Sequence, residues 1–233
     1  MYGMLLETAR QYNVALVSVS RDEIDEEGRR RPDVCTPPVE TTVASAQEFL
    51  RELLLHRGDC SFCTKLVRRD LLENRRFPEG KLNEDFRLLT QLLEDGYQVV
   101  TLPLQLYHVF YRTGSNTRKK DKNDFSRVFV DIVENADWVF QVTERSFPKL
   151  YREAIRFGLC QRLDYMLHIP LSRMNGQDLF YRNVKRWLRR RFCDTLSNPY
   201  LSKKNRVYLI LLTIAPKTVR RVHRLKMAIT RAD

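Results

Sequence analysis

The sequence NEDFRLLTQLLEDGYQVVTLPLQLYHVFY occupies residues 83–111 and joins a helical pattern to a strand pattern. Asn83 can cap a helix over 84–95, because a side-chain oxygen at that position accepts an unpaired N–H of the first turn. Gly96 is the natural end of this helix, since glycine adopts the left-handed conformation freely. The β-branched and aromatic residues after it are typical of strands, with a break at Pro103. This succession predicts an α/β arrangement.

Helical and strand patterns also alternate in the residues toward the N-terminus. Residues 4–12 predict a short amphipathic helix, and the alternating, β-branched run Val14–Ser20 predicts a strand. Ser45 has an acidic residue three positions later, so it can form a capping box for a helix over 46–56. Residues 65–74 predict a further short helix. The N-terminal half is therefore mixed α/β.

Beyond residue 124 the patterns are helical throughout. The predicted helices cover 124–143, 148–168, 177–193, 202–212 and 217–230. A polar, basic linker, Arg118–Asp124, precedes them. The sequence thus predicts two domains, with an α/β domain over 1–117 and an all-α region over 118–233.

Charge is divided unevenly between these two parts. Residues 1–117 hold 15 Lys and Arg against 18 Asp and Glu, whereas residues 118–233 hold 26 against 11. The resulting net charges, −3 and +15, account for the total of +12. A strongly basic half indicates an anionic partner, such as nucleic acid, an anionic membrane surface or a phosphorylated ligand. The alternative interpretation is a basic helical surface that faces solvent and has no anionic partner.

Length and composition exclude several classes of protein. The 233 residues are 43% hydrophobic and 30% charged, which allows a packed core and excludes disordered and collagen-like chains. The apolar run Val207–Ile214 is interrupted by Thr213 and is far shorter than the roughly 20 residues of a spanning helix. The first residues lack the basic-then-apolar pattern of a secretory signal. We therefore expect a cytoplasmic protein, either soluble or at the inner face of the cell membrane.

The cysteines do not indicate a disulfide framework or a metal site. Their number, five, is odd, and their spacing is irregular. Cys60 and Cys63 form a lone CxxC motif without a second pair, whereas a structural zinc site needs four ligands. Reduced cysteines in a cytosolic protein are the expectation.

Four short motifs follow one another in the second half of the predicted α/β domain. They are KLVRRDLL at Lys65–Leu72, RFPEG at Arg76–Gly80, EDF at Glu84–Phe86 and YHVFYRTGS at Tyr107–Ser115. Their order and spacing resemble the second half of bacterial family-2 glycosyltransferases of the type that builds capsular polysaccharides and exopolysaccharides. The resemblance covers residues 1–117, because the N-terminal helix and strand and the acidic loop after them are also similar.

This resemblance implies the acceptor-side half of a GT-A fold. Such enzymes transfer a sugar from a nucleotide-diphosphosugar to a glycan or lipid-linked acceptor with inversion. Their first half binds the nucleotide and carries the D-x-D motif that holds a divalent metal, Mg²⁺ or Mn²⁺, and neither that half nor the motif is present in this sequence. We therefore expect the complete enzyme to need a preceding donor-binding half, and this chain alone to bind no metal and to be inactive.

The resemblance also assigns candidate residues. Asp85 is the expected general base, and Glu84 is a neighbour that shapes the site. Arg112, Ser115 and His108 are expected near the donor diphosphate, where guanidinium and hydroxyl groups suit phosphate oxygens. From the residues alone, Asp85 is equally suited to a helix first turn as a partner of the helix dipole.

A second hypothesis rests on the basic C-terminal half. Lys185–Phe192 and Lys217–Lys226 combine basic residues with large apolar ones, as in amphipathic helices that dock on anionic membranes. A nucleic-acid partner is less favoured, because the sequence contains no zinc finger or other familiar nucleic-acid module. The alternative function is therefore a non-catalytic helical module that binds an anionic membrane surface or nucleic acid.

Overall fold

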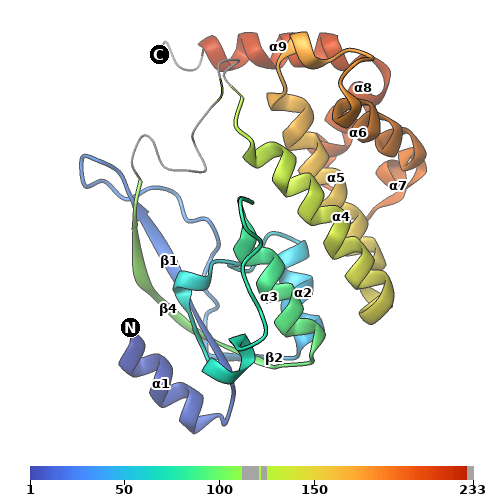
Figure 1. Ribbon diagram of the computed structural model, residues 1–233. Coiled ribbons are helices and arrows are strands. Elements are labelled where there is room, and N and C mark those ends of the chain that lie inside the picture. The colour runs from blue at the N-terminus through green and yellow to red at the C-terminus, as the bar shows by residue number, and fades with distance from the viewer. Residues whose placement is uncertain (112–120, 122–124, 230–233) are drawn as a thin grey trace. The chain divides into compact units, whose positions relative to one another are not determined.

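The computed structural model describes residues 1–111, 121 and 125–229, and the chain divides into two compact units (Figure 1). Unit 1 comprises Met1–Asn116 and Gln141–Leu150, and unit 2 comprises Thr117–Phe140 and Tyr151–Asp233. The sequence did not predict that Gln141–Leu150 would belong to the N-terminal unit. In this segment, Arg145 and Ser146 both donate hydrogen bonds to a carboxylate oxygen of Glu94.

A mixed sheet forms the centre of unit 1. Its described strands are β1 (Leu16–Ile24), β2 (Thr42–Ala44), β3 (Lys65–Val67) and β4 (Val99–Phe110), in the order β2-β4-β1-β3. The two long strands, β1 and β4, pair in parallel, while the short strands pair antiparallel at the edges. The parallel pair needs a crossover, which the helices between the two strands provide.

Three helices accompany this sheet, namely α1 (Tyr2–Gln11), α2 (Ala46–Leu54) and α3 (Glu84–Glu94). Helix α1 buries Leu5 against side chains of β1 and β4. Helix α2 places Phe49, Leu50, Leu53 and Leu54 in the core, and α3 adds a further buried set of leucines. An α/β unit is therefore present, as predicted.

Several local predictions for unit 1 are confirmed. Ser45 forms the predicted capping box, because Glu48 N donates to Ser45 Oγ at 3.3 Å and Ser45 N donates to Glu48 Oε2 at 2.8 Å. Gly96 follows α3 with φ +86°, the left-handed conformation that ends a helix. Asn83 precedes α3 with φ +59°, but its side chain makes no capping hydrogen bond to the described first turn, contrary to prediction.

Two other predictions for this unit are wrong. Residues 65–74 do not form a helix, because Lys65–Val67 pairs with β1 as strand β3 and a 3-10 turn, Arg69–Leu72, follows. Pro103 does not interrupt the strand pattern, since β4 continues through it. Between Thr101 and Gln105 the register with β1 shifts, and proline is tolerated at such irregularities, where its missing N–H costs no ladder bond.

The described part of unit 2 is helical. Its helices are α4 (Val128–Ser146), whose last residues belong to unit 1, α5 (Tyr151–His168), α6 (Leu179–Arg190), α7 (Phe192–Ser197), α8 (Lys203–Ile214) and α9 (Pro216–Ile229). Helix α5 is buried along most of its length and contacts α6, α7, α8 and α9. The helix predicted over 177–193 is divided, with α6 ending at Arg190 and α7 beginning at Phe192. None of the helices in the described ranges is long and apolar enough to cross a membrane.

Candidate functional site

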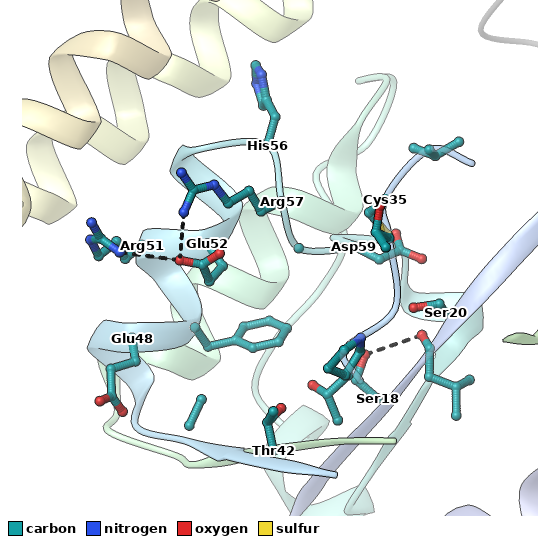
Figure 2. Close-up of a pocket in the computed structure, with 18 of the residues that line it drawn as sticks. Ser18, Ser20, Cys35, Thr42, Glu48, Arg51, Glu52, His56, Arg57 and Asp59 are labelled. Atoms are coloured by element: carbon teal, nitrogen blue, oxygen red, sulfur yellow. Dashed lines mark hydrogen bonds and ion pairs between the residues drawn. The ribbon is translucent and has the colours of Figure 1, made fainter. Parts of the chain in front are cut away.

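A cavity of about 790 Å³ lies within unit 1 beside the sheet. Its lining comes from β1, β2, α2, the loop 33–38, the loop 56–59 and Thr101 of β4 (Figure 2). The side chains around it are mostly polar, with Phe49 as an aromatic wall. Its volume falls within the range of small-molecule sites in proteins.

One wall of the cavity carries charged groups of α2 and the loop after it. Figure 2 shows Glu52 between Arg51 and Arg57, and its carboxylate lies 3.4 Å and 3.9 Å from the two guanidinium groups. All three side chains are more than a third exposed, so these ion pairs contribute little to stability. This wall is therefore a solvated rim rather than a binding centre.

The opposite part of the cavity is buried. Asp59 is 8% exposed and lies beside Cys35 and near Ser20 (Figure 2). Asp59 Oδ1 accepts the N–H of Ser61 at 2.9 Å, whereas Asp59 Oδ2 is buried without a hydrogen-bond partner among the described residues. A buried carboxylate oxygen without a donor is costly, so a ligand that brings one stabilises this site.

The loop that carries Asp59 is ordered by a buried lysine. Lys65 is 5% exposed, and its Nζ donates to the carbonyl oxygens of Asp59 at 2.7 Å and Ser61 at 3.0 Å and to Thr64 Oγ1 at 3.2 Å. These contacts use the three donors of an ammonium group. Burial lowers the pKa of Lys65 below its ordinary value, and the nearby Asp59 carboxylate opposes that shift. The sequence alone gave Lys65 no role.

Phe62, which follows Ser61 in this loop, holds the side chain of Asp85. The N–H of Phe62 donates to Asp85 Oδ2 at 2.9 Å, and Asp85 stands in the first turn of α3. Asp59 and Asp85 therefore accept hydrogen bonds from consecutive peptide groups, those of Ser61 and Phe62. Arg21 adds a contact from β1, because its Nη1 donates to Ser61 Oγ at 2.5 Å. The loop thus links the carboxylate in the cavity wall to the predicted general base.

The remaining predicted site residues are placed differently. Glu84 precedes Asp85 in the same turn and is half-buried. His108 lies on β4, where its Nδ1 is 2.7 Å from Asp22 Oδ1, and no described contact joins it to Asp85. Arg112 and Ser115 lie outside the described residues.

The cysteines of this loop are poor nucleophiles. Burial raises the pKa of Cys60 to about 11, and the Asp59 carboxylate adds to the shift. Burial and Asp59 also raise the pKa of Cys63 and of Cys35. Such thiols stay protonated at neutral pH, and all five cysteines, each within the described residues, are free.

The divalent metal that the resemblance implies does not fit these residues. Within the described ranges, no group of three or more His, Cys, Asp or Glu side chains could hold a metal ion. The unpartnered oxygen of Asp59 has protonated thiols for neighbours, and Lys65 and Arg21 supply positive charge close by. We therefore assign no metal to this site.

Local sequence signals for this site are weak. Asp59 and Ser61 have the spacing of an Asx turn, in which a side-chain oxygen accepts the N–H two residues later. That pattern is common in loops and does not reveal the unpartnered oxygen.

The comparisons with known proteins assign no identity: no protein-family model matches the chain, and no curated protein matches it.

Proposed function

We propose that this chain is the acceptor-side part of an inverting glycosyltransferase that uses a nucleotide-diphosphosugar donor. The observation that carries the proposal is the setting of Asp85. Its Oδ2 is fixed by the Phe62 N–H, while its Oδ1 has no hydrogen-bond partner among the described residues. A carboxylate held by one oxygen keeps the other available to receive a proton.

In the proposed reaction, an acceptor hydroxyl attacks the anomeric carbon of the donor sugar on the face opposite the diphosphate. The bond between that carbon and the phosphate oxygen breaks, and the nucleoside diphosphate leaves with the electron pair. The hydroxyl proton passes to Asp85 Oδ1. Because the attack comes from the face opposite the diphosphate, the configuration at the anomeric carbon is inverted. Glu84, in the same turn, shapes the site beside this carboxylate.

The cavity supports a hydroxyl-rich acceptor. Asp59 lines the cavity, and its Oδ2 is buried without a donor among the described residues, so a sugar hydroxyl that enters beside it gains an acceptor once that oxygen is uncovered. Phe49 offers an aromatic wall for the C–H groups of a sugar ring. Because Asp59 and Asp85 accept from consecutive peptide groups, acceptor binding and proton transfer depend on the same loop.

The proposal assigns the nucleotide, its diphosphate and the Mg²⁺ or Mn²⁺ ion to a donor-binding half outside these 233 residues. Arg112 and Ser115 remain proposed diphosphate contacts. His108 is a weaker candidate, because Asp22 already lies at 2.7 Å from its Nδ1.

Sugar transfer and ligand binding test the proposal separately. The chain, expressed together with the coding sequence upstream of Met1, is assayed for transfer from UDP- and GDP-sugars in the presence of Mn²⁺. By isothermal titration, we expect the chain alone to bind these donors weakly. Tight, metal-dependent binding by the chain alone contradicts the assignment of the donor site to another half.

Acceptor binding is measured on the chain alone by saturation-transfer NMR with neutral oligosaccharides. Asp59→Asn should weaken binding about fivefold or more, since it replaces a charged acceptor of hydroxyl donors. Glu40→Gln changes an exposed acid outside the cavity and serves as the matched control. Failure to bind saccharides together with failure to transfer sugar overturns the proposal.

A further inference from the structure

Two consecutive helices of unit 2, α8 and α9, expose large aliphatic side chains. The exposed residues are Val207 (55%), Leu211 (46%) and Ile214 (71%) on α8, and Val222 (62%), Leu225 (62%) and Ile229 (66%) on α9. We call these two sets the aliphatic stripes. Single exposed apolar residues are ordinary, but three at helical spacing on each of two joined helices are not.

Each stripe occupies one face of its helix. The spacing is i, i+4, i+7 on α8 and i, i+3, i+7 on α9, which places the side chains above one another. The other face of α8 is already packed, because Leu209 and Leu212 are fully buried in the core of unit 2. The α8 stripe is therefore additional apolar surface, not a misplaced core face, and α9 contacts the same core through the partly buried Val219.

Basic residues border both stripes. At about 100° per residue, Arg221 and Lys226 fall on the two sides of the α9 stripe, and Lys203 and Lys204 fall at the start of the α8 stripe. The wider surroundings are also cationic, since residues 179–229 contain fourteen Lys and Arg and a single acidic residue, Asp194. An apolar stripe bordered by cations is the composition of a helix that lies in a membrane interface.

We infer that α8 and α9 dock on an anionic lipid bilayer. The aliphatic stripes enter the boundary between headgroups and acyl chains, and the bordering basic groups bind lipid phosphates. Nucleic acid is less suitable, because its phosphates engage the cations and leave the aliphatic side chains in water. Helices of 12 and 14 residues lie along a bilayer surface and do not cross it.

Vesicle co-sedimentation of the full chain tests this inference. The vesicles contain phosphatidylcholine alone or with about a third phosphatidylglycerol, and the expected result is strong pelleting with the anionic vesicles only. Leu225→Gln/Ile229→Gln should lower the partition coefficient about tenfold or more, since each buried CH₂ contributes to membrane affinity. Arg221→Gln/Lys226→Gln, which removes the two basic groups beside the α9 stripe, should lower the partition coefficient about fivefold for each charge removed.

A matched control removes exposed aliphatic side chains from unit 1. Leu6→Gln/Val39→Gln, at positions 45% and 101% exposed, should leave vesicle binding unchanged. All substituted positions are exposed, and circular dichroism verifies that each variant is folded. Equal pelleting of the stripe variant and the wild type overturns the inference. So does equal binding to neutral vesicles.

Two further measurements distinguish the partners. Leu225→Trp should show a blue-shifted emission that brominated lipids quench, whereas Val39→Trp should show neither effect. If the chain binds a DNA or RNA probe with steep salt dependence, ignores anionic vesicles and is insensitive to Leu225→Gln/Ile229→Gln, the partner is nucleic acid and the inference is wrong.

Discussion

Both units bury a basic side chain, and they satisfy it in different ways. In unit 1, Lys65 Nζ donates to two carbonyl oxygens and one hydroxyl of its own loop. In unit 2, Arg162 donates to Asp137 Oδ1 at 2.5 Å and lies 3.8 Å from the centre of the Trp187 ring. A rotatable ammonium gathers backbone carbonyls, whereas a planar guanidinium suits a carboxylate and an aromatic face. The lysine therefore orders a loop, and the arginine joins helices.

The largest expected effect concerns Asp85, the proposed general base, whose carboxylate accepts a hydrogen bond from the lysine-ordered loop. In the proposed enzyme, with its donor-binding half, Asp85→Asn should lower kcat by about 10²–10⁴-fold, the usual contribution of a general base, with donor affinity little changed. Steady-state kinetics measure this, with exposed Glu79→Gln as the control. Near-normal turnover by a folded Asp85→Asn enzyme removes Asp85 from the chemistry.

The second prediction compares thiols in the two units. Cys60 in the ordered loop has its pKa raised to about 11, so at pH 8 only about one thiol in a thousand is ionised. Iodoacetamide should therefore modify exposed Cys193 of unit 2 about a hundred times faster than Cys60, as followed by peptide mass spectrometry. The Cys60 rate should rise about tenfold per pH unit up to pH 11. Equal rates at pH 8 contradict this prediction.

The third prediction removes the buried ammonium. Lys65→Met should lower the free energy of unfolding by about 2–4 kcal/mol, because the buried Asp59 carbonyl loses its donor, and Ser61 O and Thr64 Oγ1 lose one of their hydrogen bonds. Urea denaturation measures the change. The exposed counterpart in unit 2, Lys203→Met, should change stability by less than about 0.5 kcal/mol.

The pH dependence of this difference has a defined sign. Burial lowers the pKa of Lys65 in the folded chain below the ordinary 10.5 of the unfolded chain. At pH values between the folded and the unfolded pKa, the unfolded chain therefore binds more protons than the folded one. Wild-type stability relative to Lys65→Met should therefore rise as the pH is raised toward 10.5. A difference that falls over that range contradicts the assigned direction.

Amide hydrogen exchange distinguishes the role of Lys65 in ordering its loop from the role of Arg162 in joining helices. Lys65→Met should remove amide protection at Ser61 and Phe62, whose N–H groups bind the two carboxylates. Arg162→Met should destabilise unit 2 and leave that protection unchanged. If both variants expose the same amides, Lys65 is not a specific organiser of the loop.

The smallest expected effect compares helix caps in the two units. Ser45 in unit 1 is part of a reciprocal capping box, whereas Ser202 in unit 2 caps α8 by accepting from Asn205 N at 3.2 Å. Ser45→Ala should lower the free energy of unfolding by about 1–2 kcal/mol, and Ser202→Ala should lower it by about 0.5–1 kcal/mol. Urea denaturation of both variants measures the ranking, and Ser→Thr at each position should restore most of the loss.

Features set by a few neighbouring residues were predictable. The box of Ser45 and Glu48, the stop at Gly96 and the change from mixed to purely helical structure all follow from local patterns. The strand at Lys65–Val67 was not predictable, because its conformation depends on pairing with Leu16–Ser18 some fifty residues earlier. Tertiary pairing overrides local helix preference in such short segments.

The site was predictable only as separate residues. Asp85 is a candidate from its motif and its place in a first turn, but the peptide N–H that holds its carboxylate, at Phe62, lies 23 positions earlier. Asp59 Oδ2 is buried in a cavity lined by the loops 33–38 and 56–59 together with β1. No local pattern specifies that these segments meet. Lys65 lies among strand residues and gives no sign from its neighbours that its ammonium is buried.

The discontinuity of unit 1 has a consequence for how this gene can change by recombination. A crossover after codon 117 would exchange most of unit 1 but separate Glu94 from its partners Arg145 and Ser146. A crossover after codon 150 would keep them together but carry Thr117–Phe140 away from the rest of unit 2. Neither single exchange preserves both units, so recombination at one point should transfer them intact only together, although each packs as a separate body.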